Sequence, residues 1–345
     1  MTNQHEITKR MPLLNREGNL TEPGWARGLL WDYHRPDIRA SGMRIKEWDY
    51  YFVSNGHIGL ALTIADNGYM GLDSVSYLDF DEKWEITKSP MRLLPMGKTA
   101  LPETSTAGSS EIARGGYALA FYHDDDGTRK LTFHMDKFRG KDAIEGMISL
   151  SDEPAESMVI ATPFEKSGHF YYNQKINCMR ASGWIELGGA RVELDPKTWF
   201  AVLDWGRGVW TYHNTWYWGS ASGEVDGVPF GWNIGYGFGD TSAASENVLF
   251  YGGKIHKLSQ VRFEIPMQDG EENYLAPWRF SSDDGRFEMA FTPILNRAAY
   301  TSVGVIKSDQ NQVFGRFTGT ATLDDGTVLQ VNDFFGFAEK VENKW

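Results

Sequence analysis

Residues 228–238 read VPFGWNIGYGF, and this stretch decides the fold class of the chain. Every second residue is large and apolar, while the residues between them are proline, asparagine and glycine. Adjacent side chains of a β-strand point to opposite faces, so the stretch predicts a strand with one aromatic face and almost no side chains on the other. A helix would scatter the same residues around its circumference. The apolar face comprises Val228, Phe230, Trp232, Ile234, Tyr236 and Phe238.

The same alternation recurs on both sides of this stretch, at residues 57–64 and 314–323. Turn sequences that tolerate a positive φ separate such runs, among them Asn55-Gly56 and Asp325-Gly326. Aromatic residues, which favour strands, make up 14% of the chain, and no long run shows the apolar spacing of a helix. The sequence therefore predicts an all-β protein of antiparallel sheets with few short helices.

A chain of 345 residues fits one very large domain or two of ordinary size. A faint echo between residues 48–69 and 214–240, each an aromatic strand, a turn and an apolar strand, favours two domains. We expect residues 1–44 to form an arm that packs on the rest, residues 45–185 to form a first domain, and residues 186–345 to form a second.

The charge of the chain limits its partners. The formal net charge is −12 and no basic run occurs, which argues against nucleic-acid binding and against electrostatic docking to anionic membranes. No stretch has the roughly eighteen unbroken apolar residues of a membrane helix, so we expect no integral membrane segment. Residues 1–10 lack the apolar core of a secretory signal, and Cys178 is the one cysteine. We therefore expect a cytoplasmic protein in which Cys178 is a small buried hydrophobe.

Motifs for metals and cofactors are missing from the sequence. The eight histidines are scattered, without a His-x-x-x-His or Cys-x-x-Cys spacing. No helix pattern follows Gly235-x-Gly237-x-Gly239, so this is not a dinucleotide fingerprint, and neither a P-loop nor a Gly-x-Ser-x-Gly elbow occurs. We expect neither a metal nor a cofactor.

Residues 199–223, WFAVLDWGRGVWTYHNTWYWGSASG, carry a family resemblance. A strand that ends in Asp204-Trp205 is followed by a Gly-Arg-Gly turn and by a strand with Trp216 and Trp218. This pattern resembles the second-domain signature of a group that contains AttH-like proteins, carotenoid hydratase (hydroxyneurosporene synthase) and tocopherol cyclase. In the hydratases the acidic residue is commonly followed by a histidine or another polar residue, whereas the sequence WGR follows it here.

The chain is more similar still to a large bacterial family of uncharacterised proteins related to this group. Short motifs spread over nearly the whole chain carry this similarity. They are Leu13-Leu14…Gly18-x-Leu20 with Gly24-Trp25-Ala26-Arg27, Trp48-Asp49-Tyr50 with Asp66-x-Gly68-Tyr69, Gly336-x-Ala338-Glu339, and Trp345. The resemblance implies two tandem lipocalin-like (calycin) antiparallel β-barrels. It implies no function, because that family has none assigned.

Asp204 is the candidate acid. On a regular strand it shares a face with Phe200 and Val202, and a carboxyl among apolar side chains loses solvation, so it could stay protonated and donate a proton. Alternatively, Asp204 pairs with Arg207 or caps the turn. Arg207 could bind a ligand carboxylate or phosphate, or serve as a structural ion-pair partner. His213 could shuttle a proton at neutral pH, or be a hydrogen-bonded structural histidine.

The aromatic residues around this acid could form the wall of a ligand-binding cavity. The faces of Trp and Tyr rings would stabilise positive charge on a ligand. Alternatively, the same residues form a simple packed core. The candidates are Trp205, Trp210, Trp216, Trp218, Trp232 and Tyr236.

We expect the protein to bind a hydrophobic small molecule, such as a terpenoid, a lipid or a polyketide-like compound, in an aromatic-lined barrel cavity. The acid could then catalyse hydration, cyclisation or isomerisation of that molecule, as a lyase or an isomerase does. A non-catalytic carrier or sensor of lipids or isoprenoids would need the cavity but no acid. A third hypothesis is a carbohydrate-active or carbohydrate-binding protein, whose hydrolytic form would need a facing pair of carboxylates. The sequence leaves the oligomeric state open.

Overall fold

Strands make up almost all the regular structure in the computed structural model, which describes residues 4–124, 126–303 and 306–344. Trp345 of the family motifs and the first three residues of the expected arm lie outside the described residues. The helices of the described part are two short 3₁₀-helices, η1 (Arg35–Asp37) and η2 (Gly42–Arg44). None of them is long and apolar enough to cross a membrane. The predicted all-β fold with few short helices is confirmed.

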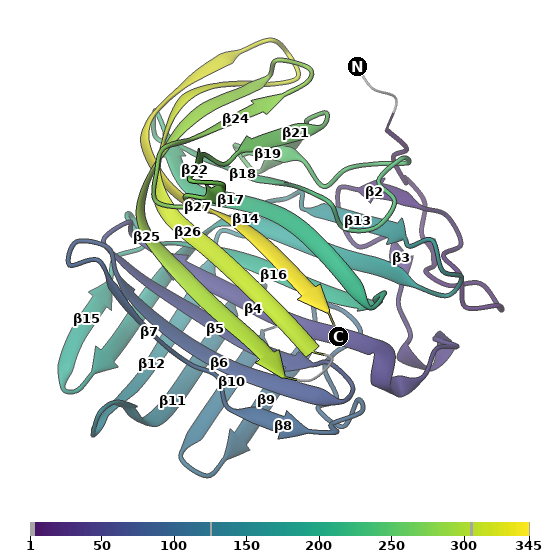
Figure 1. The fold of residues 1–345 in the computed structure, drawn as a ribbon, viewed down its shortest axis with the longest axis horizontal. Helices are drawn as coiled ribbons and strands as arrows, with labels where there is room; N and C mark the ends of the chain where they lie inside the picture. The colour runs from purple at the N-terminus through teal and green to yellow at the C-terminus, as the bar shows by residue number, and fades with distance from the viewer. Residues whose placement is uncertain (1–3, 125, 304–305, 345) are drawn as a thin grey trace.

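The first sheet, coloured from purple to teal in Figure 1, has fourteen strands. They are β2 (Gly24–Ala26), β4 (Ile45–Ser54), β5 (Ile58–Asp66), β6 (Met70–Asp79), β7 (Trp84–Lys88), β8 (Met91–Leu93), β9 (Gly108–Arg114), β10 (Tyr117–His123), β11 (Arg129–Arg139), β12 (Asp142–Ser151), β13 (Met158–Pro163), β14 (Phe170–Leu187), β15 (Ala190–Leu194) and β16 (Phe200–Val209). Its main path runs β7-β6-β5-β4-β16-β14-β12-β11-β10-β9, and β2, β8, β13 and β15 branch from it.

The second sheet has nine strands, in the order β20-β19-β18-β17-β27-β26-β25-β24-β21. They are β17 (His213–Val225), β18 (Val228–Tyr236), β19 (Val248–Tyr251), β20 (Lys254–Lys257), β21 (Val261–Glu264), β24 (Trp278–Ser282), β25 (Phe287–Val303), β26 (Ile306–Thr322) and β27 (Val328–Lys344). Two small sheets pair β1 (Met11–Pro12) with β3 (Trp31–Asp32), and β22 (Met267–Gln268) with β23 (Glu271–Glu272).

Each large sheet curls around its own apolar side chains. In β18, Phe230, Trp232 and Ile234 are fully buried in the core of the second sheet, as the alternation of residues 228–238 predicts. Val53 and Leu62 belong to the separate core of the first sheet. Two curled antiparallel sheets, each wrapped around a core, are consistent with the predicted lipocalin-like barrels.

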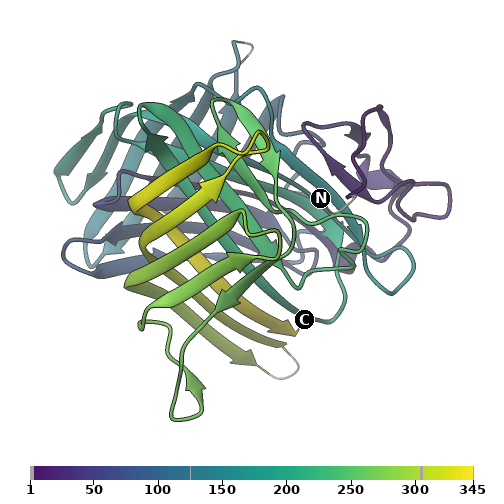
Figure 2. The ribbon, with the colours of Figure 1, turned by 90° about the horizontal axis from the view of Figure 1, so that it is seen from above.

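The two sheets also pack against each other, and Figure 2 shows the strands of the second sheet stacked on those of the first. Two further apolar clusters occupy this contact. One of them contains Tyr171 and Phe238, and the other contains Phe52 and Phe337. The outer faces of both sheets are therefore partly buried, and any site between them is built from both.

A bulge in β14 ties the sheets together. Cys178, at φ 66°, lies where the register with β16 shifts, and it is buried as predicted. The side-chain nitrogen of the neighbouring Asn177 lies 2.8 Å from Ser220 Oγ and 3.0 Å from the carbonyl oxygens of Ala221 and Trp232. One amide of the first sheet thereby bonds to β17 and β18 of the second.

The chain passes from the first sheet to the second between Val209, where β16 ends, and His213, where β17 begins. The boundary expected at residues 185 and 186 lies inside β14, a strand of the first sheet. Residues 4–44 run beside the first sheet, where β2 pairs with β13. The division into domains stays a prediction.

Candidate functional site

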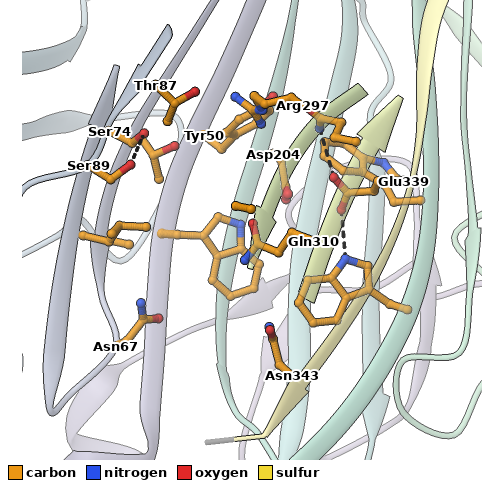
Figure 3. A pocket seen from close by; sticks show the side chains of 18 of the residues that line it. Tyr50, Asn67, Ser74, Thr87, Ser89, Asp204, Arg297, Gln310, Glu339 and Asn343 are labelled. Carbon is orange, nitrogen blue, oxygen red and sulfur yellow. Dashed lines mark hydrogen bonds between the residues drawn. The ribbon is translucent and has the colours of Figure 1, made fainter. Parts of the chain in front are cut away.

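A cavity of about 310 Å³ lies between the two sheets. Side chains of β4, β5, β6, β7, β14 and β16 line it from the first sheet, and side chains of β17, β25, β26 and β27 line it from the second (Figure 3). The sequence predicts an aromatic-lined cavity inside a barrel. The structure has it outside the barrels, because the interior of each sheet is filled by core side chains such as the fully buried Trp232.

Strand register brings polar side chains into line on both walls of this cavity. Residues paired across neighbouring strands share a face, so a register row presents its side chains together. One row crosses β14, β16, β4, β5 and β6, and a second crosses β17, β27, β26 and β25. The first row comprises Lys175, Asp204, Tyr50, Thr63 and Ser74, and the second comprises Trp218, Glu339, Gln312 and Arg297. We call these two rows the charged tier.

Lys175 and Asp204 form a buried ion pair in the charged tier. Lys175 Nζ lies 2.9 Å from Asp204 Oδ1, and the side chains are 4% and 12% exposed. The side-chain amide of Asn173 donates to the same oxygen at 2.6 Å. Lys175 Nζ also lies 4.0 Å from the centre of the Trp218 ring on the opposite wall. Asp204 is therefore paired with Lys175, and not with Arg207 as the alternative reading of the sequence suggests.

Glu339 is the carboxyl that the second sheet contributes to the charged tier. Trp216 Nε1 donates to its Oε1 and Gln312 Nε2 donates to its Oε2, each at 2.9 Å. Burial raises the pKa of Glu339 to about 6, although the Trp216 hydrogen bond and the charge of Arg297 act to lower it. A carboxyl with this pKa populates both protonation states near neutral pH, so it can act as a general acid or base.

A third carboxyl, Glu246, lines the cavity next to these groups. The side-chain amide of Asn233 donates to its Oε2 at 3.2 Å, and Trp218 Nε1 donates to Asn233 Oδ1 at 2.7 Å. Burial raises the pKa of Glu246, while the charge of Lys175 lowers it. Burial thus raises the pKa of both Glu246 and Glu339, and the charge of Lys175 opposes the rise in each.

Arg297 is the second cation of the charged tier. Its Nη1 donates to Ser76 Oγ at 2.8 Å, and this bond crosses from β25 of the second sheet to β6 of the first. No carboxylate of the described residues lies within 4.0 Å of its guanidinium. The hydroxyl of Tyr50 is buried nearby, and this burial raises its pKa. Arg297 is therefore the cation that a polar group of a ligand could approach.

Five aromatic rings form a wall beside the charged tier: Trp48, Tyr171, Trp210, Trp216 and Phe238. The ring centre of Trp210 lies 5.2 Å from that of Trp48, 5.8 Å from that of Trp216 and 4.8 Å from that of Phe238. We call this cluster the aromatic wall. It offers ring faces and edges to an apolar ligand, and the faces attract positive charge.

Four of the predicted site residues line the cavity: Asp204, Trp210, Trp216 and Trp218. They come from the dense aromatic segment at residues 199–223. The structure brings them together because β16 and β17 lie in different sheets, and the chain crosses between the sheets at Trp210.

Arg207 and Trp205 lie on the opposite face of β16, inside the first sheet. The predicted Gly-Arg-Gly turn is wrong, since this segment continues β16. A Cβ at Gly206 would come within 2.0 Å of the Trp48 indole, so the glycine allows this ring to lie on the strand. Arg207 is fully buried, and its Nη1 donates to Asp49 Oδ1 at 3.0 Å. Its Cζ lies 4.2 Å from the centre of the Trp205 ring. The guanidinium of Arg207 is therefore already bound by groups of the protein itself.

His213, Trp232 and Tyr236 do not line the cavity. His213 is exposed at the start of β17, and its Nε2 lies 3.5 Å from Glu342 Oε1. Trp232 lies in the core of the second sheet, and Tyr236 stacks on Tyr217 with ring centres 4.4 Å apart. The structure does not bring these three residues together with Asp204.

Sequence reasoning missed Lys175, Glu246, Arg297 and Glu339. Glu339 belongs to a quoted family motif and alternates with Phe337 and Val341, which are buried. A carboxyl on an otherwise apolar strand face is the signal that could have identified it. Arg297 and Glu246 have no comparable signal in the sequence around them.

In the part of the chain that the structure describes, no group of three or more His, Cys, Asp or Glu side chains is placed so that it could hold a metal ion. The carboxylates of the charged tier have partners within the protein. Asp204 faces Lys175, and Glu339 faces Trp216 and Gln312.

Comparisons with known proteins agree with this architecture. A family model described as a domain of unknown function (DUF2804) matches residues 4–345, and no curated protein matches the chain. A solved structure of an AttH-like protein from Nitrosomonas europaea is 14% identical with a TM-score of 0.53, and the match covers 86% of this chain and 92% of that one. Kievitone hydratase from Nectria haematococca is 9% identical with a TM-score of 0.54, covering 97% and 98%. Such low identities show a shared fold and nothing more.

Proposed function

The chain belongs to the DUF2804 family, and from the chemistry of its cavity we propose that it binds a hydrophobic small molecule between its two sheets and protonates it there. A terpenoid, lipid or polyketide-like compound with a C=C bond fits a cavity of about 310 Å³ with an aromatic wall. Glu339 is the proposed proton donor.

The proposed reaction begins with transfer of the Glu339 proton to one carbon of the double bond, which leaves positive charge on the neighbouring carbon. The ring faces of Trp48 and Trp216 stabilise this charge. Water, or a nucleophile of the same molecule, then bonds to the cation, and the proton it releases returns to the Glu339 carboxylate. Water gives hydration and an internal nucleophile gives ring closure, while loss of a proton from a different carbon to the Glu339 carboxylate gives an isomer.

One observation carries this proposal: the Glu339 carboxyl is buried in the cavity against Trp216 of the aromatic wall, and this burial raises its pKa to about 6. A general acid works best when its pKa lies near the operating pH. Asp204 supports this state, since its charge also raises the pKa of Glu339. The fold shared with kievitone hydratase is consistent with such chemistry, but it is an analogy at the level of the fold.

The Glu339→Gln variant tests the proposal. The purified protein is incubated with a lipophilic metabolite extract, and mass spectrometry follows compounds that gain the mass of one water or change retention at constant mass. We expect the wild-type protein to convert such a compound, and Glu339→Gln to be at least about 100-fold slower. Wild-type turnover by Glu339→Gln would exclude Glu339 as the acid.

A non-catalytic carrier is the second candidate, and one observation favours it. Both oxygens of Glu339 already accept hydrogen bonds, and Asp204 is paired with Lys175, so these two carboxyls have protein partners without a ligand. A carrier would retain its ligand unchanged. Native mass spectrometry of freshly purified protein, repeated after long incubation, distinguishes a persistent ligand from a consumed one.

A further inference from the structure

Two side-chain amides lie at the other end of the cavity. Asn67 directly follows β5 of the first sheet, and Asn343 lies near the end of β27 of the second, with both lining the cavity. Figure 3 shows them toward the lower end, with Arg297 toward the upper end. Asn343 is four residues from Glu339 along its strand, so about 13 Å separates the two positions.

The side chain of Asn343 is buried without a partner. The residue is fully buried, and neither its Nδ2 nor its Oδ1 has a hydrogen-bond partner. Its neighbours in the register have their own bonds: Asn214 is bonded to Thr211, and Ser308 Oγ accepts from Gln310. A buried donor and a buried acceptor that stay unpaired are costly and rare in folded proteins.

We propose that the ligand of this cavity is an elongated, largely apolar molecule that carries a carboxamide-type group, a carbonyl beside an N–H, and places it against Asn343. The proposal rests on the proposed function, because it names the chemical class that the same cavity takes. The ligand carbonyl accepts from Nδ2 of Asn343, and the ligand N–H donates to its Oδ1.

Other polar groups satisfy Asn343 less well. An ester, a carboxylate or a phosphate offers only acceptors and leaves Oδ1 unpaired, and a hydrocarbon leaves both atoms unpaired. An anionic group would also lie in a cavity that already holds the carboxyls of Asp204, Glu246 and Glu339. A neutral amide meets neither difficulty.

The stretch between the two polar ends determines the shape of the ligand. Ala65 and Leu72 line it from the first sheet, and Trp48 and Trp216 add ring surface. An apolar body therefore spans this stretch while the amide stays at Asn343. The reactive double bond of the same molecule then reaches Glu339.

Three probes of matched size test the proposal on the full-length protein: 4-phenylbutanamide, methyl 4-phenylbutanoate and the 4-phenylbutanoate anion. Their dissociation constants are measured by calorimetry and by quenching of tryptophan fluorescence. We expect the amide to bind at least about tenfold more tightly than the ester or the anion. Equal affinity for the amide and the ester, or no detectable amide binding, overturns the proposal.

The Asn343→Leu variant tests the residue itself. Leucine is similar in volume and has no polar atoms, so we expect the amide and the ester to bind equally. Asn311→Leu, on the face of β26 opposite to Gln310 and Gln312, is the matched control and should keep the preference. Should Asn343→Leu fail to fold, Asn343→Ala carries the same expectation. An amide preference that survives in the folded variant overturns the proposal.

Failure of this inference is distinguishable from failure of the proposed function. Glu339→Gln should keep the amide preference, because Asn343 is untouched. An amide preference without turnover supports the ligand class and argues against the acid role of Glu339. Turnover of a compound that lacks a carboxamide supports the acid role and argues against the ligand class.

Discussion

Lys175 and Asp204 face each other directly across β14 and β16, with Nζ of the lysine 2.9 Å from Oδ1 of the aspartate. Both residues belong to the first sheet, whereas Glu339 comes from the second. The two partners act on Glu339 in opposite directions, since Lys175 lowers its pKa and Asp204 raises it. The protonation of an acid on one sheet is therefore tuned by an ion pair on the other.

Replacing Asp204 should move the pH profile of the reaction. Asp204→Asn removes a negative charge that raises the pKa of Glu339, so this pKa should fall. Turnover that needs protonated Glu339 should then decline at a lower pH than in the wild type, with the low-pH rate kept within about tenfold. A pH–rate profile measures the shift. Complete loss of turnover at every pH would instead assign the acid role to Asp204.

Stability should depend on pH through Glu339. Its pKa is raised from the ordinary 4.5 to about 6, so the folded state binds this proton more tightly than the unfolded state. The bound proton stabilises the folded state by about 2 kcal/mol below pH 4.5, and this stabilisation is lost as the pH rises through 6. Glu339→Gln lacks this loss, so its stability relative to the wild type should increase over that interval. Urea unfolding at several pH values measures it, and a difference independent of pH would contradict the raised pKa.

Removing Lys175 should destabilise the fold. Lys175→Met leaves the buried carboxylate of Asp204 without its cation, which costs about 3–5 kcal/mol in comparable pairs. The double variant Lys175→Met/Asp204→Leu should recover much of this loss, because no unpaired charge remains. The ion pair of Lys340 with Glu272 is more exposed than that of Lys175 with Asp204. Lys340→Met, which breaks it, should lower the free energy of unfolding by about 1 kcal/mol or less. Equal losses in the two lysine variants would argue against a special role for the buried pair.

The glycine beneath Trp48 should resist substitution. Gly206→Ala places a Cβ about 2.0 Å from the indole, so the ring must leave its position in the aromatic wall. We expect a loss of about 1–3 kcal/mol in stability together with weaker ligand binding. Gly28→Ala is the control, since nothing lies within 4 Å of its added Cβ and about 0.5 kcal/mol or less should be lost. Thermal unfolding and probe binding measure both effects.

The fold was largely predictable because its signal is local. Residues 228–238 alternate so regularly that the buried face of β18 could be assigned from the sequence. The Gly-Arg-Gly segment was wrongly predicted to be a turn, because glycine occurs both in turns and where another group approaches the backbone closely. The local sequence does not reveal that Trp48, which is distant in the chain, lies on Gly206.

The site was only half predictable. Asp204, Trp216 and Trp218 lie in one dense aromatic segment, so sequence reasoning found them. Arg297 and Glu339 meet them through the register of β25, β26 and β27, which is a non-local property. Alternation also shows which residues share a face but not which face meets the other sheet. The cavity was therefore expected inside a barrel and not between the two.

No wall of the cavity closes it alone, because one side belongs to each sheet. A small slide or rotation of one sheet over the other would change the width of the cavity while leaving every lining residue on its own strand. The apolar packing that sets this angle, such as Phe52 against Phe314 with ring centres 5.2 Å apart, lies outside the cavity. Substitutions at such distant positions would therefore change the width of the cavity and leave the residues that line it unchanged.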